Sequence, residues 1–130
     1  MKHLRVLYLH DTPITDAGLK ELAQIEQLQA LNLAATKVTA NGMNHLTRLA
    51  ELRYLNLTMT PISDQGVDAL MGLQLLEELR LTQTLITDRG LLALGRLPKL
   101  RIVDVSGAPV TDRGVEKFKN QYPNCNVQAR

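Results

Sequence analysis

The chain holds few side chains that could act as a nucleophile or as a general acid or base. Its three histidines are His3, His10 and His45, and its single cysteine is Cys125, with no evident histidine partner. His10 is followed by Asp11, but adjacent residues of a strand point to opposite sides and cannot share a proton there. The histidines also fall at three different positions of the repeat described below. We therefore predict no catalysis and no cofactor: the protein is not expected to be an enzyme.

Aspartates recur along the chain in a way that could suggest a cation site. They are Asp16, Asp64, Asp88 and Asp112, and Ala40 interrupts the row. Hard cations need several oxygens that converge on one point, whereas these carboxylates would form a row. An acidic residue in the first turn of a helix also interacts favourably with the helix dipole. We interpret these aspartates as helix starts and predict no metal site.

The net charge of +2 is too small to indicate nucleic-acid binding, but the charges are distributed unevenly along the chain. Residues 1–79 carry six Lys/Arg and nine Asp/Glu, whereas residues 80–130 carry nine and four. The asymmetry is either random drift in surface charge or a bias toward head-to-tail contacts or toward an acidic partner at the C-terminal end.

No apolar run reaches the ~18 residues of a membrane span, so we predict no membrane contact. The chain shows no basic stretch followed by an apolar stretch, the pattern of a secretion signal. A single cysteine excludes an internal disulfide framework. Together these features favour a cytoplasmic location.

An uninterrupted repeat of 24 residues must position the functional side chains. A leucine opens each of five units, an apolar residue follows three positions later, and another follows two positions after that. A fixed period of this length is typical of a solenoid, in which one unit cannot bury its apolar face alone. We call each unit a coil and interpret residues 1–130 as a single domain. The columns are Leu4, Leu28, Leu52, Leu76 and Leu100; Leu7, Leu31, Leu55, Leu79 and Val103; and Leu9, Leu33, Leu57, Leu81 and Val105.

Each coil is predicted to contain a strand, a turn and a short helix. In the first coil Leu7 and Leu9 point inward from the strand, and the residues that alternate with them point outward. Thr15 is a good helix N-cap, and apolar residues then recur at helical spacing. Strands that all run in one direction form a parallel sheet with helices on its other face. Because strands lie ~4.8 Å apart and helices are ~10–12 Å across, the sheet must lie on the concave face and the helices on the convex face.

Two further columns have structural explanations. A glycine lies in the first helical turn of every coil, where a side chain would strike the turn or the neighbouring coil. A threonine follows the strand in four coils, and its hydroxyl can pair with backbone groups of the turn. The fifth coil has Ala108 at that position. The columns are Gly18, Gly42, Gly66, Gly90 and Gly114, and Thr12, Thr36, Thr60 and Thr84.

The run L-x-x-L-x-L-x-x-T-x-I-T-D-x-G-L-x-x-L-x-x-L, found from Leu4 to about Asn124, resembles the leucine-rich repeat. Threonine in place of the commoner Asn or Cys, with the Thr-Asp-x-Gly helix start, is similar to the cysteine-containing or F-box-protein-like subclass and to bacterial repeat proteins. The resemblance implies an α/β fold, a right-handed horseshoe solenoid, and a usual role in protein–protein interaction without catalysis.

The N-terminal edge of the repeat is expected to be partly open. Met1 falls at the position of the last inward helix residue, so nothing precedes it that could cap the first coil. Leu4, Leu7 and Leu9 are candidate edge contacts beside an unpaired strand. Three interpretations stay open: a longer solenoid, a homodimer through this edge, or a ragged end.

The C-terminal end has a different pattern. Phe118 replaces a leucine, and Tyr122 begins a stretch that departs from the repeat. Val127 falls at the repeat position of Leu7, which predicts a short final strand. We therefore interpret residues 122–130 as a closing half-repeat.

The outward strand positions have no packing role and are the best candidates for binding. Tyr and Arg are enriched in interaction hot spots, which favours Tyr8, Tyr54 and Arg80 as anchors, with neighbouring side chains setting the polarity. The alternative is a merely hydrated sheet face. The partner-binding set predicted on the concave face is Tyr8, His10, Asn32, Tyr54, Asn56, Arg80 and Asp104.

We hypothesise a non-enzymatic interaction module that binds a protein or peptide on the concave sheet. The alternative is an assembly unit that self-associates or docks through the uncapped N-terminal edge, or a fragment of a larger repeat receptor or adaptor. A regulatory inhibitor of an enzyme would use the same face.

Overall fold

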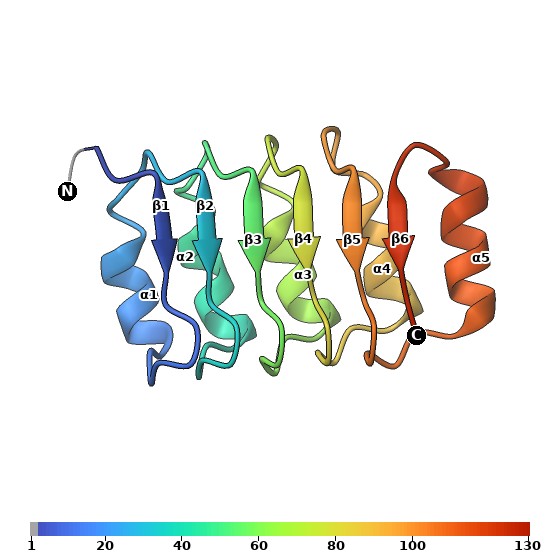
Figure 1. Ribbon diagram of the computed structural model, residues 1–130, viewed down its shortest axis with the longest axis horizontal. Helices are drawn as coiled ribbons and strands as arrows, with labels where there is room; N and C mark the ends of the chain where they lie inside the picture. Colours follow the sequence, from blue (N-terminus) through green and yellow to red (C-terminus); the bar gives the residue numbers. More distant parts are fainter. Residues whose placement is uncertain (1–2) are drawn as a thin grey trace.

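The structure, a computed structural model, describes residues 3–130. Strands and helices alternate along the chain (Figure 1). The strands are β1 (Val6–Tyr8), β2 (Ala30–Asn32), β3 (Tyr54–Asn56), β4 (Glu78–Arg80), β5 (Ile102–Asp104) and β6 (Asn126–Gln128). The helices are α1 (Asp16–Leu22), α2 (Met43–Leu46), α3 (Asp64–Leu70), α4 (Asp88–Leu94) and α5 (Asp112–Gln121), and a 3₁₀ turn η1 (Ala40–Gly42) directly precedes α2.

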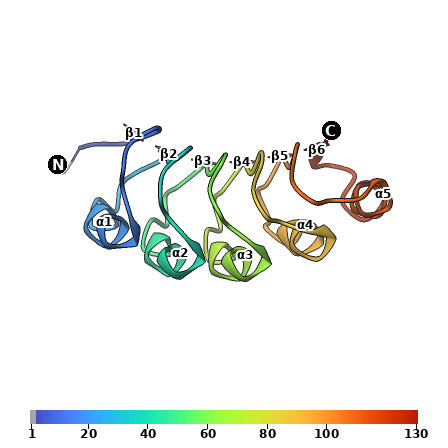
Figure 2. The same ribbon diagram turned by 90° about the horizontal axis from the view of Figure 1, so that it is seen from below.

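The strands form one parallel sheet in the order β1-β2-β3-β4-β5-β6. Residues that pair across neighbouring strands are one repeat apart, from Leu7 opposite Leu31 to Val103 opposite Val127. The helices all lie on one side of the sheet, on the outer side of a curved stack, and the sheet lines the inner side (Figure 2). This confirms the predicted α/β solenoid with a concave parallel sheet.

The core runs along the inside of the stack between the sheet and the helices. Leu31, Leu55 and Leu79 have no exposed surface, whereas their equivalent in the first coil, Leu7, is only half-buried. Leu4 and Leu9 are half-buried too, as expected for a partly open edge. The expectation attached to Met1 lies outside the described residues.

The turn after each strand is built in the same way in successive coils. Thr36, Thr60 and Thr84 each donate a hydroxyl hydrogen bond to the carbonyl three residues earlier, at 2.6–2.7 Å. Thr12 does the same in the first coil, so the predicted pairing with the backbone is confirmed. The residue before each of these threonines has a left-handed backbone, with φ of 55–60° at Asp11, Ala35, Met59 and Gln83. Gly107 precedes Ala108 at the same repeat position of the fifth coil and has φ of 75°.

The aspartates at the helix starts connect neighbouring coils, a role that the sequence interpretation missed. Asp16 accepts from the backbone N–H of Thr39 at 2.7 Å and from its hydroxyl at 2.6 Å. Asp88 accepts from the same two groups of Thr111, at 2.8 and 2.6 Å. Asp64 binds Thr87 in the same way. The helix dipole is therefore not the whole reason for an aspartate at this position.

The N-cap threonines are correctly located, but their expected role is only partly right. Thr15 and Thr87 occupy the N-cap without a capping hydrogen bond from their side chains. Thr39 and Thr111 do accept one, from the N–H groups of Asn41 and Gly114 respectively. Stacking and capping are compatible at these two residues, because each hydroxyl donates to the aspartate of the preceding coil while it accepts the capping hydrogen bond.

The glycines in the first helical turn make room for these carboxylates. A Cβ atom at Gly42, Gly90 or Gly114 would overlap the aspartate of the preceding coil. The predicted clash with the neighbouring coil is thus confirmed, and the neighbour is identified. At Gly66 the preceding coil offers Ala40 instead, 3.5 Å from such a Cβ.

Two aromatic residues pack inward from the last helix and its C-terminal end. Phe118 is fully buried, and its ring centroid lies 5.3 Å from that of Tyr122. Tyr122 packs so closely on Gly95 that a Cβ atom there would overlap its ring. The chain then enters β6, which pairs with β5 at the position predicted for Val127.

Candidate functional site

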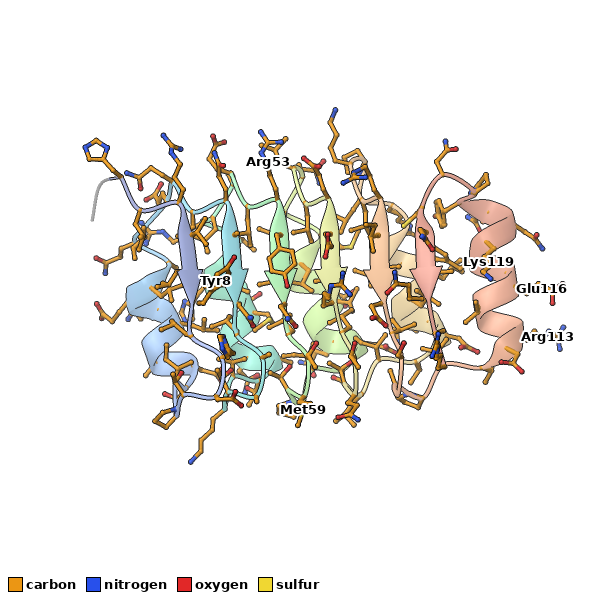
Figure 3. The ribbon with its side chains drawn as sticks, viewed as in Figure 1. Tyr8, Arg53, Met59, Arg113, Glu116 and Lys119 are labelled. Atoms are coloured by element: carbon orange, nitrogen blue, oxygen red, sulfur yellow. The ribbon has the colours of Figure 1, made fainter. Side chains whose placement is uncertain are left out.

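Two rows of outward side chains cross the concave sheet, and the strand register defines them. The first row is Val6, Ala30, Tyr54, Glu78, Ile102 and Asn126, and the second row is Tyr8, Asn32, Asn56, Arg80, Asp104 and Gln128. The β-strand pleat places both rows on the same face because their members are two residues apart along each strand. Figure 3 looks onto this face and labels Tyr8 on it.

The N-terminal part of this face is apolar and exposed. Val6 and Tyr8 keep 47% and 61% of their surface accessible. Ala30 lies between Val6 and Tyr54 in the first row, so a small side chain separates two large ones. His10 follows β1 and is exposed. These residues offer contact area with few fixed charges.

The central part of the face holds a small charge network. The guanidinium of Arg80 contacts Glu78 Oε2 at 2.7 Å and Asp104 Oδ2 at 3.5 Å. The hydrogen bond to Glu78 raises the pKa of Arg80; burial opposes this, and the charges of Glu78, Tyr54 and Asp104 add to it. Arg80 is therefore not a free cation, and an acidic ligand group would have to compete with Glu78.

The Asn and Asp side chains of the second row accept hydrogen bonds from the backbone of the turns that follow the strands. Asn32, Asn56 and Asp104 each accept a hydrogen bond through Oδ1 from the N–H two residues later, at 2.9–3.0 Å. This is the local pairing that favours Asn and Asp at turns. Recurrence of Asn or Asp at one repeat position was the signal that could have revealed this role.

The predicted site residues thus form two groups. Tyr54, Asn56, Arg80 and Asp104 lie on the neighbouring strands β3, β4 and β5. Tyr8 and His10 lie at or just after β1, with Asn32 on β2 between the groups. The candidate edge contacts Leu4, Leu7 and Leu9 belong to the same coil as Tyr8 and are half-buried.

Comparison with known families decides what kind of repeat this is. The family described as Leucine Rich repeat matches residues 1–23, 51–71, 72–95 and 96–119. The chain belongs to the leucine-rich repeat family. Proteins of this family are in general interaction modules without enzymatic activity.

Two solved leucine-rich repeat structures resemble the whole chain. Internalin C2 of Listeria monocytogenes superposes with a TM-score of 0.80 at 26% sequence identity, over 99% of this chain and 53% of that one. The leucine-rich repeat protein LIC12759 of Leptospira interrogans gives 0.75 at 22% identity, over 98% of this chain and 31% of that one, and shows the fold alone. The chain thus spans about half and about a third of these proteins. No curated protein sequence matches it.

The remaining chemistry of this leucine-rich repeat chain is sparse. Cys125 is free and buried, and burial raises the pKa of its thiol, which disfavours the nucleophilic thiolate. Among residues 3–130 no three His, Cys, Asp or Glu side chains are grouped so that they could hold a metal ion. Within the same residues, no helix has the length and apolar character needed to cross a membrane.

Proposed function

We propose that this leucine-rich repeat chain is a non-enzymatic module that binds a protein or peptide on its concave sheet. The observation that carries the proposal is the exposure of Val6 and Tyr8 beside half-buried Tyr54, on a face that no helix covers. Aromatic side chains supply large contact area at low cost in conformational entropy, and they dominate interaction hot spots.

The two groups of site residues suit different parts of one ligand. An apolar side chain of the ligand fits over Ala30, between Val6 and Tyr54. A polar or charged group fits the network of Glu78, Arg80 and Asp104, where hydrogen-bonding partners of both signs are available. We propose Tyr8, Tyr54 and Arg80 as the anchors, with His10, Asn32, Asn56 and Asp104 around them. The proposed partner is a protein or peptide, and neither a nucleic acid nor a membrane.

The proposal is tested with peptides selected from a displayed random library against the immobilised chain. Selected peptides should lose affinity for a variant carrying Tyr54→Ala and Arg80→Ala. The matched control carries Lys20→Ala and Glu21→Ala, which remove two exposed side chains from the convex helix α1. Peptides that bind the concave variant as tightly as the control would contradict the proposal.

A second candidate function, self-association through the first coil, is supported by a separate observation. Leu7 and Leu9 are half-buried although Leu31 and Leu33 are fully buried at the same repeat positions. A homodimer through β1 would cover them and extend the sheet. Light scattering should then show a dimer that Leu9→Gln disrupts. The control Leu85→Gln removes a leucine that is 55% exposed on another coil. A monomer at high concentration would rule this function out.

A further inference from the structure

The convex face carries a groove between α4 and α5, which lie side by side at the C-terminal end of the stack (Figure 2). Its volume is about 370 Å³, and its lining is Asp88, Arg89, Leu92, Arg113, Gly114 and Lys117. This surface is on the opposite side of the molecule from the concave sheet.

The cations of this groove have no acidic partner within residues 3–130. The ion pairs of these residues involve Arg48, Arg53, Arg80 and Arg101 instead. The one acid of the groove, Asp88, uses both carboxylate oxygens to bind Thr111 of the next coil. Three exposed cations thus line a groove whose one carboxylate already has its hydrogen bonds.

The arrangement of these cations is unfavourable for the isolated chain. Arg113 and Lys117 are four residues apart on α5, and like charges at this spacing destabilise a helix by about 0.2–0.5 kcal/mol. Arg89 occupies the same repeat position as Arg113 on the adjoining coil, which adds a further like charge. A bound anionic group would relieve this repulsion.

The groove also has an apolar component at a position that is polar elsewhere. Leu92 is half-buried, whereas the equivalent residues in the other coils are Lys20, Asn44, Asp68 and Glu116. A leucine beside unpaired cations suits a ligand that combines carboxylates with an apolar side chain. The groove lining contains no aromatic residue on which a nucleic-acid base could stack.

We propose that this basic groove, defined by Arg89, Leu92, Arg113 and Lys117, binds an acidic segment of a partner protein that also carries leucine-like side chains. The ligand carboxylates meet Arg89 and Arg113, whose planar guanidinium groups suit carboxylate geometry. The apolar side chain of the ligand packs on Leu92. Figure 3 shows Arg113 extended from α5 and away from α4. To meet a ligand in the groove this side chain turns toward α4, and exposed side chains reorient within nanoseconds.

The experiment measures fluorescence anisotropy of a labelled peptide with the repeated sequence Glu-Glu-Leu at low ionic strength. The chain should bind this peptide, and Arg89→Glu with Arg113→Glu should weaken binding at least about tenfold. Leu92→Ser should weaken binding of this peptide but leave the weaker binding of polyglutamate unchanged. The resonances of Gly114 and Leu92 should shift on titration, because both line the groove.

The matched control is Arg96→Glu with Lys99→Glu, which changes the net charge equally at two exposed residues outside the groove. An equal loss of affinity in the control would show attraction by net charge alone and would overturn the proposal. Absence of peptide binding would overturn it too. Tighter binding of duplex DNA or of phosphatidylserine vesicles through the same residues would replace the proposed partner with that one. Because the site is remote from the concave sheet, none of these outcomes depends on the proposed function.

Discussion

At the scale of single residues, the glycines and aspartates show how far the repeat pattern predicts side-chain roles. A clash with the turn or with the neighbouring coil could be predicted at each glycine, because all five coils share the glycine. The carboxylate that fills this space could not be assigned, because the contact depends on the offset between stacked coils. Asp16 and Thr39 are 23 residues apart, and their adjacency follows only once the coils are stacked.

Gly90→Ala should destabilise the protein, whereas Gly66→Ala should have a smaller effect. A Cβ at residue 90 overlaps the Asp64 carboxylate, and forcing it in costs about 1–3 kcal/mol. At residue 66 it meets the Ile62 Cγ2 methyl at 2.9 Å but no carboxylate, and alanine adds helix propensity. Urea unfolding of both variants measures the difference, and equal losses would show that the carboxylate does not set the glycine requirement.

Ala35→Gly should increase stability relative to Ala34→Gly by about 1–2 kcal/mol. Residue 35 has φ of 55°, a left-handed conformation that strains any residue with a Cβ atom. Residue 34 has no such conformation, so glycine there only adds freedom to the unfolded chain. Thermal unfolding of the two variants compares them directly. Indistinguishable midpoints would mean that the turn stores no backbone strain.

At the scale of elements, strand positions follow from the sequence more closely than helix lengths. The period of two that places Leu7 and Leu9 inward is local, so every strand is predictable. The second helix is different: η1 and the four-residue α2 replace the longer helix of the other coils. This coil has Ala40 where an aspartate stands in the others, so its helix start lacks the bond to the next coil.

Ala40→Asp should restore that bond and stabilise the stack. Gly66 leaves space for a carboxylate beside Ser63, whose N–H and hydroxyl match the donors of Thr39 and Thr87. Hydrogen bonds to a charged group at a partly exposed site contribute about 0.5–1.5 kcal/mol. Asn41→Asp is the control, since it adds the same charge to the same helix start at an exposed position. Denaturant unfolding measures the stability of both variants, and amide exchange at Ser63 should slow in Ala40→Asp. An equal gain in the free energy of unfolding from both variants would mean that the helix dipole alone is the cause.

At the scale of the whole molecule, the repeat determines the curvature and the faces. Strands and helices differ in width, so the concave sheet follows from packing dimensions alone. The chemistry of each face is less predictable, because it depends on pairs between coils. The Arg80 network requires Glu78 on the same strand and Asp104 on the next one. The basic groove requires that Arg89 and Arg113 form no ion pair within residues 3–130. Neither condition can be read from one coil.

The concave face is the central claim, and the affinity of a selected peptide for matched variants tests it most directly. Isothermal titration of the variant with Tyr54→Ala and Arg80→Ala should give a Kd about thirtyfold higher than that of the unaltered chain, since hot-spot residues contribute at least ~2 kcal/mol. The control variant with Lys20→Ala and Glu21→Ala should bind like the unaltered chain. A Kd that stays within about twofold for the concave variant would contradict the assignment of the binding surface to the sheet.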